Sequence, residues 1–315
     1  MVIRPRTAVI GAGMAGLTCA TDLRAAGHSV VVFDKARGPG GRMSTRRLAL
    51  ETGEAAFDHG ASSFTAAGAD FRAQVEAWML QGLAAPWAAA GPGCFVGLPA
   101  MNTPLKAMAA ELETRWTCPV AGLSREGSAW RLEGAAEVEG LFDRVVLAIP
   151  AEQAAVLLAT VQPAFAALAQ ASPSAPCWSL MVVFERPVES PLAVLTGGEV
   201  VAWAGREASK PGRAGPEAWV IQACPIWSRE NLEITAEEAA SRLLRGFEVL
   251  LGRASPRSVS TVAHRWRYAR PEGPPRDVLW DPETGLGVCG DWLGGGSVEG
   301  AWRSGRQLAS LLTER

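Results

Sequence analysis

The sequence lacks a strong excess of charge of either sign. Its 30 Lys and Arg residues nearly balance 32 Asp and Glu residues, and the formal net charge is −2. A protein that binds nucleic acid through the phosphates presents a clear basic excess. Lysine is scarce, because the only ones are Lys35, Lys106 and Lys210, and we attribute the arginine excess to genome composition. We therefore expect no nucleic-acid partner.

Closely spaced cysteines are also missing. The six cysteines are isolated, without CxxC or metal-ligand spacing: Cys19, Cys94, Cys118, Cys177, Cys224 and Cys289. This predicts free, mostly buried thiols and no metal site. The N-terminal residues MVIRPR lead directly into the first expected strand and leave no room for a signal peptide. Together these features predict a protein of the reducing cytoplasm.

Uninterrupted hydrophobic runs of membrane-spanning length are absent too. Two uncharged or nearly uncharged stretches, 77–105 and 153–184, are broken by seven prolines: Pro86, Pro92, Pro99, Pro104, Pro163, Pro173 and Pro176. Proline removes a backbone donor and interrupts a helix. We therefore expect no membrane partner. The length of 315 residues with 48% hydrophobic residues suffices for one large domain or two closely joined domains.

The clearest motif that is present lies in residues 7–34, TAVIGAGMAGLTCATDLRAAGHSVVVFD. Its pattern predicts a strand over 7–10, a glycine turn, a helix over about 14–26, and a second strand that ends at Asp34. A GxGxxG turn between strand and helix, with an acid at this distance, is typical of the first β-α-β unit of a dinucleotide-binding domain. The alternative is a glycine-rich turn without a ligand.

Each residue type in the motif has a physical reason. Gly11 permits the tight turn, Gly13 lets a pyrophosphate approach the backbone, and Gly16 lets the helix pack closely on the sheet. The helix N-terminus offers free N–H groups to the phosphates. Asp34 can accept hydrogen bonds from an adenosine ribose.

A second glycine cluster, KARGPGGRMST, follows the acid at residues 35–45. The pair Gly40–Gly41 allows close backbone approach to another part of the same ligand, and Arg42 can pair with pyrophosphate oxygens. The alternative is a solvated basic loop.

The segments GAGMAG and FDKARGPGGRMSTRR resemble the flavin amine-oxidase superfamily, and so does GLGVCGDWLGGGSVEGAW at 285–302. With FDHGAS near residue 60, DRVVLAIPA at 143–151 and AHRWRYARP at 263–271, the whole chain is most similar to the renalase branch. The resemblance implies non-covalently bound FAD. It also implies an α/β fold in which a Rossmann-like FAD-binding domain carries an inserted, mostly antiparallel β-sheet substrate domain.

Patterns along the chain agree with that architecture. Strands are expected at 144–149, 177–185, 200–204, 218–223 and around 264–268, with shorter alternating strands in 117–132. Helices are expected at 71–80, after 102, at 151–170, at 235–251 and at 298–312, and residues 81–96 are expected to form a loop. We assign 1–75, 97–150 and 275–315 to the FAD-binding domain, and 76–96 and 151–274 to the substrate-binding domain.

The resemblance also implies roles for individual residues. Gly60 and Ala61 would lie beside the flavin ring, although Ser62–Ser63 replace the Gln and aromatic residue that often follow in the family. Val120 would contact the adenine, and Asp291 the ribityl or pyrophosphate part. The N-terminus of the last helix would face the flavin N1 and C2 carbonyl. The full set of expected cofactor contacts is Gly11, Ala12, Gly13, Met14, Ala15, Gly16, Asp34, Lys35, Gly41, Arg42, Met43, Gly60, Ala61, Val120, Ala148, Asp291 and Val298.

Three alternating residues, His264, Trp266 and Tyr268, fall on one face of an expected strand. In the renalase-like interpretation they line the substrate pocket as the catalytic candidates, and His264 positions the substrate by hydrogen bonding. The alternative is a structural histidine. His59, next to the expected flavin contact, is compatible with either role. Because Tyr268 is the only tyrosine, the paired-tyrosine cage of many amine oxidases cannot form, which argues against a conventional amine substrate.

Two further features leave alternatives open. In the segment REASKP at 206–211, Arg206 and Lys210 could meet a phosphorylated substrate, or the segment could be a solvated surface loop. The tryptophans of the expected antiparallel sheet are core residues or part of a face that covers the flavin: Trp178, Trp203, Trp219 and Trp227.

The sequence contains no second dinucleotide motif with the required strand and helix context, so a substrate must reduce the flavin directly and oxygen would reoxidise it. The resemblance implies oxidation of isomeric dihydronicotinamides to NAD(P)+ with release of hydrogen peroxide. The partners would be this small molecule and O2. Alternatives are an amine or other small-molecule oxidase or desaturase, and a non-catalytic FAD-binding regulatory protein. The oligomeric state is not predicted.

Overall fold

The computed structural model describes residues 5–51, 53–134 and 140–314. The chain forms two compact units. Unit 1 comprises Met1–Gly41, Leu105–Ser174 and Pro271–Arg315, and unit 2 comprises Arg42–Pro104 and Ala175–Arg270. The boundaries of these units differ from those of the predicted domains. Residues 42–75 and 97–104, assigned to the FAD-binding domain, belong to unit 2, and residues 151–174 and 271–274, assigned to the substrate-binding domain, belong to unit 1. The assignment of these segments to cofactor or substrate binding stays a prediction.

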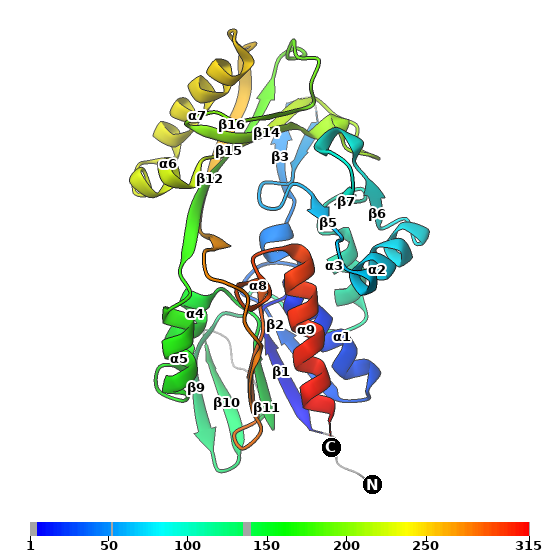
Figure 1. Cartoon of the computed structure of the whole chain (residues 1–315), viewed down its shortest axis with the longest axis vertical. Helices are drawn as coiled ribbons and strands as arrows, with labels where there is room; N and C mark the ends of the chain where they lie inside the picture. Colours follow the sequence, from blue (N-terminus) through cyan, green and yellow to red (C-terminus); the bar gives the residue numbers. More distant parts are fainter. Residues whose placement is uncertain (1–4, 52, 135–139, 315) are drawn as a thin grey trace. The chain divides into compact units, whose positions relative to one another are not determined.

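Unit 1 is built on a six-stranded sheet with the order β17-β18-β11-β1-β2-β8, of which Figure 1 labels β11, β1 and β2. All neighbours pair in parallel except the edge strand β17, which is antiparallel to β18. The expected Rossmann-like sheet is confirmed. Its strands are β1 (Arg6–Ile10), β2 (Ser29–Phe33), β8 (Glu113–Arg115), β11 (Arg144–Leu147), β17 (Leu279–Asp281) and β18 (Leu286–Val288).

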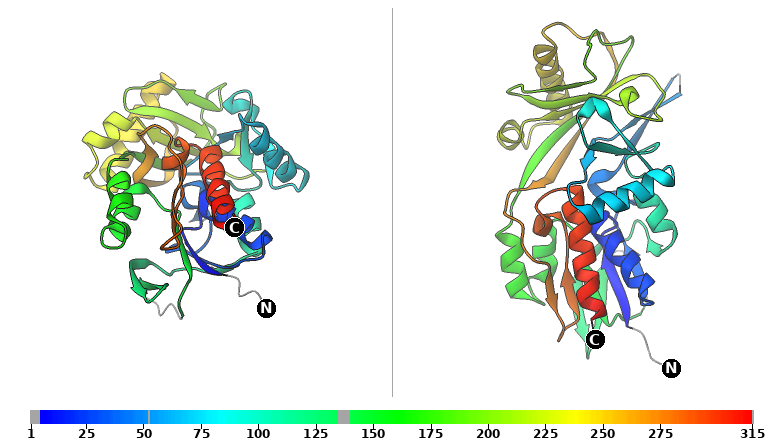
Figure 2. Two further views of the ribbon diagram at one scale, coloured as in Figure 1. Left: turned by 60° about the horizontal axis from the view of Figure 1, so that its bottom comes forward. Right: turned by 45° about the vertical axis from the view of Figure 1, so that its right-hand side comes forward.

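Helix α1 (Met14–Ala25) packs lengthwise against the C-terminal helix α9 (Val298–Thr313), and both panels of Figure 2 show the two helices side by side. The close approach depends on Gly305, because a Cβ there would come within 2.3 Å of the Ala15 carbonyl oxygen. Ser297 caps α9 by accepting a hydrogen bond from the N–H of Gly300.

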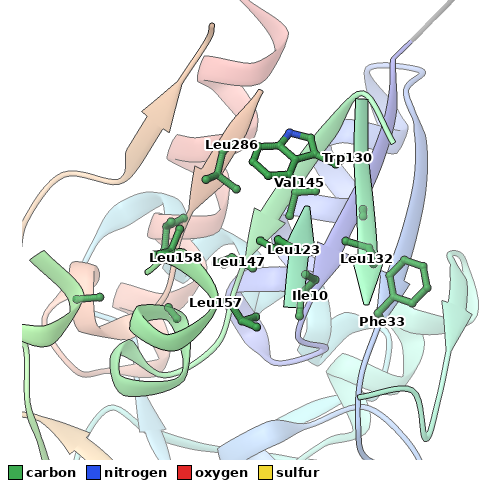
Figure 3. Close-up of a cluster of buried hydrophobic side chains, with 14 of the residues drawn as sticks. Ile10, Phe33, Leu123, Trp130, Leu132, Val145, Leu147, Leu157, Leu158 and Leu286 are labelled. Atoms are coloured by element: carbon green, nitrogen blue, oxygen red, sulfur yellow. The ribbon is translucent and has the colours of Figure 1, made fainter. Parts of the chain in front are cut away.

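The other face of the unit 1 sheet is covered by the helices α4 (Ala151–Leu158) and α5 (Pro163–Gln170) and by the hairpin β9 (Val120–Glu126) and β10 (Ala129–Gly134). Figure 3 shows alternate residues of the strands, among them Ile10, Phe33 and Leu147, pointing into this core. Trp130 is almost fully buried there, and its indole N–H donates to the Thr284 carbonyl. This core positions the carboxyl ends of the strands, where the glycine turn after β1 begins.

Unit 2 contains a five-stranded antiparallel sheet with the order β13-β14-β15-β12-β16. Its strands are β13 (Val194–Thr196), β14 (Val201–Arg206), β15 (Glu217–Ala223), β12 (Ser174–Phe184) and β16 (Ser258–Pro271). Smaller sheets are formed by β3 (Arg46–Leu50) with β4 (Gly53–Phe57), and by β5 (Phe64–Thr65), β7 (Cys94–Gly97) and β6 (Ala84–Pro86). The expected mostly antiparallel sheet is confirmed.

The five-stranded sheet has a core on each face. On one face Trp178, Trp219 and Ile221 pack against Leu243 and Phe247 of the helix α7 (Ala236–Leu251). On the other face Met181, Val183 and Val220 pack with Ala55 and Phe57 of β4. The remaining elements are α2 (Ala69–Leu80), α3 (Thr103–Ala110), α6 (Pro225–Glu230), α8 (Asp291–Gly294), and the 3-10 turns η1 (Gly41–Met43), η2 (Ala88–Ala90) and η3 (Glu207–Ser209).

Three expectations about local structure need correction. The single helix expected over 151–170 is two helices, because Pro163 begins α5 and its missing N–H cannot continue α4. Residues 81–96, expected to be a loop, contribute the strands β6 and β7 and the turn η2. The six cysteines are free as expected, but only Cys19, Cys118 and Cys289 are buried, and the other three are partly exposed. Among the described residues, no helix is both long and apolar enough to cross a membrane.

Candidate functional site

The glycine turn of unit 1 has the backbone geometry that the motif requires. Gly11 has a φ of +109°, and a Cβ there would lie 2.5 Å from the Ala148 carbonyl oxygen. A Cβ at Gly16 would lie 1.9 Å from the Gly11 carbonyl oxygen, so the helix packs directly on the turn. At Gly13, in contrast, a Cβ would meet no described atom within 4 Å. The space beside Gly13 is thus open to a ligand group.

The N-terminus of α1 suits a phosphate. No described side chain caps Gly13, and the first turn of the helix holds no acidic residue. The first N–H groups of a helix have no intrahelical acceptor, and together with the helix dipole they attract an anion. The structure therefore fits the pyrophosphate of a dinucleotide at this position.

Asp34 follows β2 and holds the turn in place. Its Oδ2 accepts a hydrogen bond of 2.7 Å from the N–H of Ala12, and its Oδ1 accepts one of 2.7 Å from the N–H of Ala36. Each carboxylate oxygen keeps a second lone pair, so these bonds leave capacity for ribose hydroxyls. The sequence predicted the ribose role but not the bond to the glycine turn.

The second glycine cluster packs on the first within unit 1. The N–H of Gly40 donates to the Ala12 carbonyl at 3.0 Å, and a Cβ at Gly41 would meet the Cα of Gly13 at 3.5 Å. Gly41 itself has a φ of +53°. The two glycine segments therefore form one continuous backbone surface, and the approach of a ligand to Gly40–Gly41 stays a prediction.

The other expected cofactor contacts of unit 1 lie on the same elements. Ala148 directly follows β11, and Asp291 comes three residues after the end of β18. Both therefore lie at the carboxyl edge of the parallel strands, and Asp291 is 8% exposed. Val120 begins β9 and packs against the core shown in Figure 3. Ala12, Met14 and Ala15 are buried, Val298 is partly buried and Lys35 is exposed. Whether each touches the cofactor stays a prediction.

In unit 2 the segment that follows β4, residues 58–62, is tightly packed. A Cβ at Gly60 would lie 2.1 Å from the Arg42 carbonyl oxygen and 3.3 Å from the Trp266 ring. The N–H of Ala61 donates to that Arg42 carbonyl at 2.8 Å. The Arg42 guanidinium itself donates to the Ala269 carbonyl at 3.3 Å, and Met43 is 4% exposed. The structure thus brings together three of the expected cofactor contacts of this unit, Arg42, Gly60 and Ala61.

His59, His264 and Trp266 form an aromatic group that we term the histidine–tryptophan cluster. The His59 ring lies 5.0 Å from the ring of His264 and 5.0 Å from that of Trp266, and the last two rings are 4.5 Å apart. His59 is 5% exposed, and its Nδ1 has no hydrogen-bond partner among the described residues. The alternation along β16 correctly predicted that His264 and Trp266 share a face. Tyr268 is partly buried two residues further on.

The two imidazoles of the cluster, one buried and one partly buried, lie near the Arg46 guanidinium. Burial, the neighbouring His264 ring and the Arg46 guanidinium lower the pKa of His59 to about 4. The Phe57 backbone and Asp58 raise this pKa, but their effects are smaller. Burial and Arg46 also lower the pKa of His264. Both rings are therefore neutral near pH 7 and can donate and accept hydrogen bonds.

In the segment REASKP, both cations form ion pairs. Lys210 is buried, and its ammonium group pairs with Asp58 Oδ2 at 2.9 Å and with Glu207 Oε1 at 2.8 Å. Arg206 pairs with Glu217 at 3.0 Å and lies over the Trp219 ring. The segment is therefore not a solvated loop, and both cations are already paired with carboxylates within unit 2.

The comparisons with known proteins decide the family. Residues 79–313 match the model described as flavin containing amine oxidoreductase, and residues 9–77 match that of an NAD(P)-binding Rossmann-like domain. The chain belongs to the family of flavin-containing amine oxidoreductases. With the open glycine cradle and uncapped α1, this makes it an FAD-dependent oxidoreductase.

Several solved structures share the fold. One is a protein assigned as a protoporphyrinogen oxidase from Exiguobacterium sp. 255-15, with a TM-score of 0.71, 12% identity and 99% coverage of each chain. Another is cyclohexylamine oxidase from Brevibacterium oxydans, with a TM-score of 0.68, 14% identity and coverage of 98% of this chain and 99% of that one. A third is putrescine oxidase bound to putrescine, with a TM-score of 0.66, 14% identity and coverage of 99% and 100%.

Proposed function

We propose that the protein is a renalase-like oxidase of isomeric dihydronicotinamides. In this reaction a dihydronicotinamide, a proton and O2 give NAD(P)+ and hydrogen peroxide. FAD, bound non-covalently, supplies the hydride acceptor at N5. The renalase-like interpretation rests on the sequence segments around residues 60, 143–151 and 263–271. The residues of this chain bind and orient the substrate, because hydride transfer needs orientation more than an acid or base.

The observation that carries the proposal is the chemistry of the histidine–tryptophan cluster. Its rings are neutral, and Arg46 acts on both histidines as a nearby positive charge. A protonated amine would be repelled by that charge, whereas a neutral dihydronicotinamide ring with anionic phosphates would not. The carboxylate nearest in sequence to the cluster, Asp58, is already paired with Lys210 and Arg213.

Within this proposal, His264 positions the substrate by hydrogen bonding and Trp266 offers a flat aromatic surface to the nicotinamide ring. His59 is added as a candidate, because its buried Nδ1, without a partner among the described residues, can accept a hydrogen bond from a ligand or donate one to it. Tyr268 keeps the role of a lining residue. The proposed cofactor contacts are those named from the sequence, with the glycine turn and Asp34 at the adenosine and pyrophosphate end.

An amine oxidase is the second candidate, favoured by the family match and by the fold that the chain shares with putrescine and cyclohexylamine oxidases. Product analysis separates the two. Purified enzyme is incubated with isomeric dihydronicotinamides or with a series of primary and cyclic amines, and NAD(P)+, aldehyde or ketone, and hydrogen peroxide are quantified. The proposal expects NAD(P)+ and peroxide in equal amounts. Carbonyl products from amines, without NAD(P)+ formation, would reject it.

A further inference from the structure

Four charged side chains of unit 2 form a buried group that the proposed reaction does not use. We term it the ion cluster, and it consists of Asp58, Glu207, Lys210 and Arg213. The side chains are between 0% and 6% exposed. Arg213 pairs with Asp58 at 2.5 Å and with Glu207 at 2.6 Å, in addition to the two contacts of Lys210. Two carboxylates and two cations thus alternate without net charge.

Burying four charges is costly, and their mutual attraction repays the desolvation only when geometry and hydrogen bonding are good. Most polar atoms of the cluster have partners, and Arg213 Nε is the exception among the described residues. Asp58 Oδ1 accepts from the Thr45 hydroxyl at 2.6 Å and from the N–H of Met101 at 3.3 Å. The Lys210 ammonium lies 5.2 Å from the centre of the Trp87 ring. Apolar side chains could fill such a site at similar stability, so its charges call for a reason other than stability.

The ion cluster holds the start of the segment 58–62. Asp58 is both a member of the cluster and the first residue of the segment 58–62, and its N–H donates to Glu207 Oε1 at 3.3 Å. Glu207 lies on η3, which is fixed by the bond of 2.8 Å from Lys210 to its Oε1. The position of Asp58 is therefore set from both its backbone and its carboxylate.

Each following residue of the segment has a further hydrogen bond within unit 2. The carbonyl of His59 accepts from the Trp266 indole at 2.9 Å, and the carbonyl of Gly60 accepts from Gln222 Nε2 at 2.6 Å. The N–H of Ala61 donates to Arg42, and the Ser62 hydroxyl donates to the Asp58 carbonyl at 3.1 Å. The start of the segment depends on the ion cluster, so loss of the cluster would release the segment from one end.

We propose that the ion cluster is a positioning device for the segment 58–61, with Lys210 as its central residue. It fixes the His59 ring in the histidine–tryptophan cluster and the Gly60–Ala61 backbone at the flavin. Lys210 acts through Asp58 and Glu207 and is therefore a positioning residue. The inference rests on the proposed function for one point, the contact of Gly60 and Ala61 with the flavin ring.

The test compares Lys210→Met with a matched control, Arg206→Met. Arg206 lies four residues away and also pairs with a partly buried carboxylate, but it has no contact with the ion cluster among those found in the described residues. Because Lys210→Met leaves an uncompensated charge, the double variant Glu207→Gln/Lys210→Met is measured as well. It removes one anion and one cation, and the amide oxygen of the introduced glutamine can still accept from the N–H of Asp58.

Two measurements are made on the FAD-loaded proteins: hydrogen exchange of peptides that contain residues 58–62, and the midpoint potential of the bound flavin. We expect exchange in this segment to rise about tenfold or more in both Lys210 variants, with a shifted potential, whereas Arg206→Met changes neither. A folded Lys210 variant with wild-type exchange in the segment would overturn the proposal. Faster exchange with an unchanged potential would overturn the flavin part of it.

Neither measurement needs a substrate. If the wild-type flavin is reduced by no dihydronicotinamide, the proposed function fails while the exchange and potential results still decide on the ion cluster. The two failures are therefore distinguishable.

Discussion

The indole N–H of Trp266 donates a hydrogen bond of 2.9 Å to the main-chain carbonyl of His59, across 207 residues of sequence. The same two residues have their rings 5.0 Å apart with an interplanar angle of 31°. One tryptophan therefore fixes both the backbone and the ring of the histidine next to the expected flavin contact.

Trp266→Phe tests this relationship. Phenylalanine keeps an aromatic ring but leaves the His59 carbonyl without its donor, which should cost about 1 to 3 kcal/mol of unfolding free energy. We also expect slower flavin reduction, on the order of tenfold, because a misplaced binding group loses orientation. Denaturant unfolding and anaerobic stopped-flow absorbance measure the two effects.

Trp178→Phe is the matched control. Trp178 lies in the other core of the same sheet, and its indole N–H donates to the Asn231 carbonyl at 3.0 Å. It should lose comparable stability without a change in flavin reduction. Equal slowing in both variants would show that the effect of Trp266 is general destabilisation.

Two glycines separate cofactor binding from folding. Gly13→Ala should fold normally, because the added Cβ meets no described atom within 4 Å, but it should retain less FAD because the methyl group stands where a pyrophosphate would approach. Gly16→Ala should lower the thermal stability of the protein itself, because its Cβ would lie 1.9 Å from a carbonyl oxygen. FAD content and melting temperature are compared. Full FAD retention by Gly13→Ala would contradict the proposed cradle.

Much of this cradle could be predicted because each of its residues acts locally. Strand, turn, helix and acid are consecutive, and periodicity with glycine chemistry suffices to place them. The ion cluster could not be predicted this way. Asp58 and Lys210 are 152 residues apart, and a segment with Arg, Glu and Lys has the composition of a solvated loop until its partners are known.

His59 illustrates the same limit. Its position beside Gly60 indicated a role, but only the packing of β16 shows that His264 and Trp266 meet it. The break between α4 and α5 is a different case, because Pro163 is a local signal: its missing N–H begins a new helix, although the alanine-rich pattern continues on both sides of it.

Stability should depend on pH through His59. Its pKa is about 4 in the folded protein and 6.5 in the reference state, so the unfolded chain binds the proton more readily between these values. The stabilisation associated with neutral His59 is complete above about pH 6.5 and decreases as the pH falls toward 4, by up to roughly 3 kcal/mol. The lowered pKa of His264 acts in the same direction, while Asp58 adds a loss at lower pH.

Denaturant unfolding between pH 7.5 and 4.5 measures this dependence. His59→Gln should flatten the profile over that range, because glutamine does not titrate. An unchanged slope in this variant would assign the pH dependence to other groups.

Arg46 should contribute to substrate preference. Arg46→Gln should lower kcat/KM for dihydronicotinamides several-fold, more at low salt than at high salt, because the removed charge acts through solvent. Arg47→Gln is the control, since Arg47 is the next residue and pairs at the surface with Glu54. Equal effects of the two substitutions would indicate a general surface-charge effect and not one at the histidine–tryptophan cluster.

The most direct test of the central claim is anaerobic mixing of the FAD-loaded enzyme with isomeric dihydronicotinamides, and separately with amines, while flavin absorbance is followed. We expect rapid bleaching by a dihydronicotinamide isomer and none by amines. Bleaching by amines alone would contradict it and support the amine oxidase. Bleaching by neither would contradict it as well and favour an FAD-binding protein with a regulatory role.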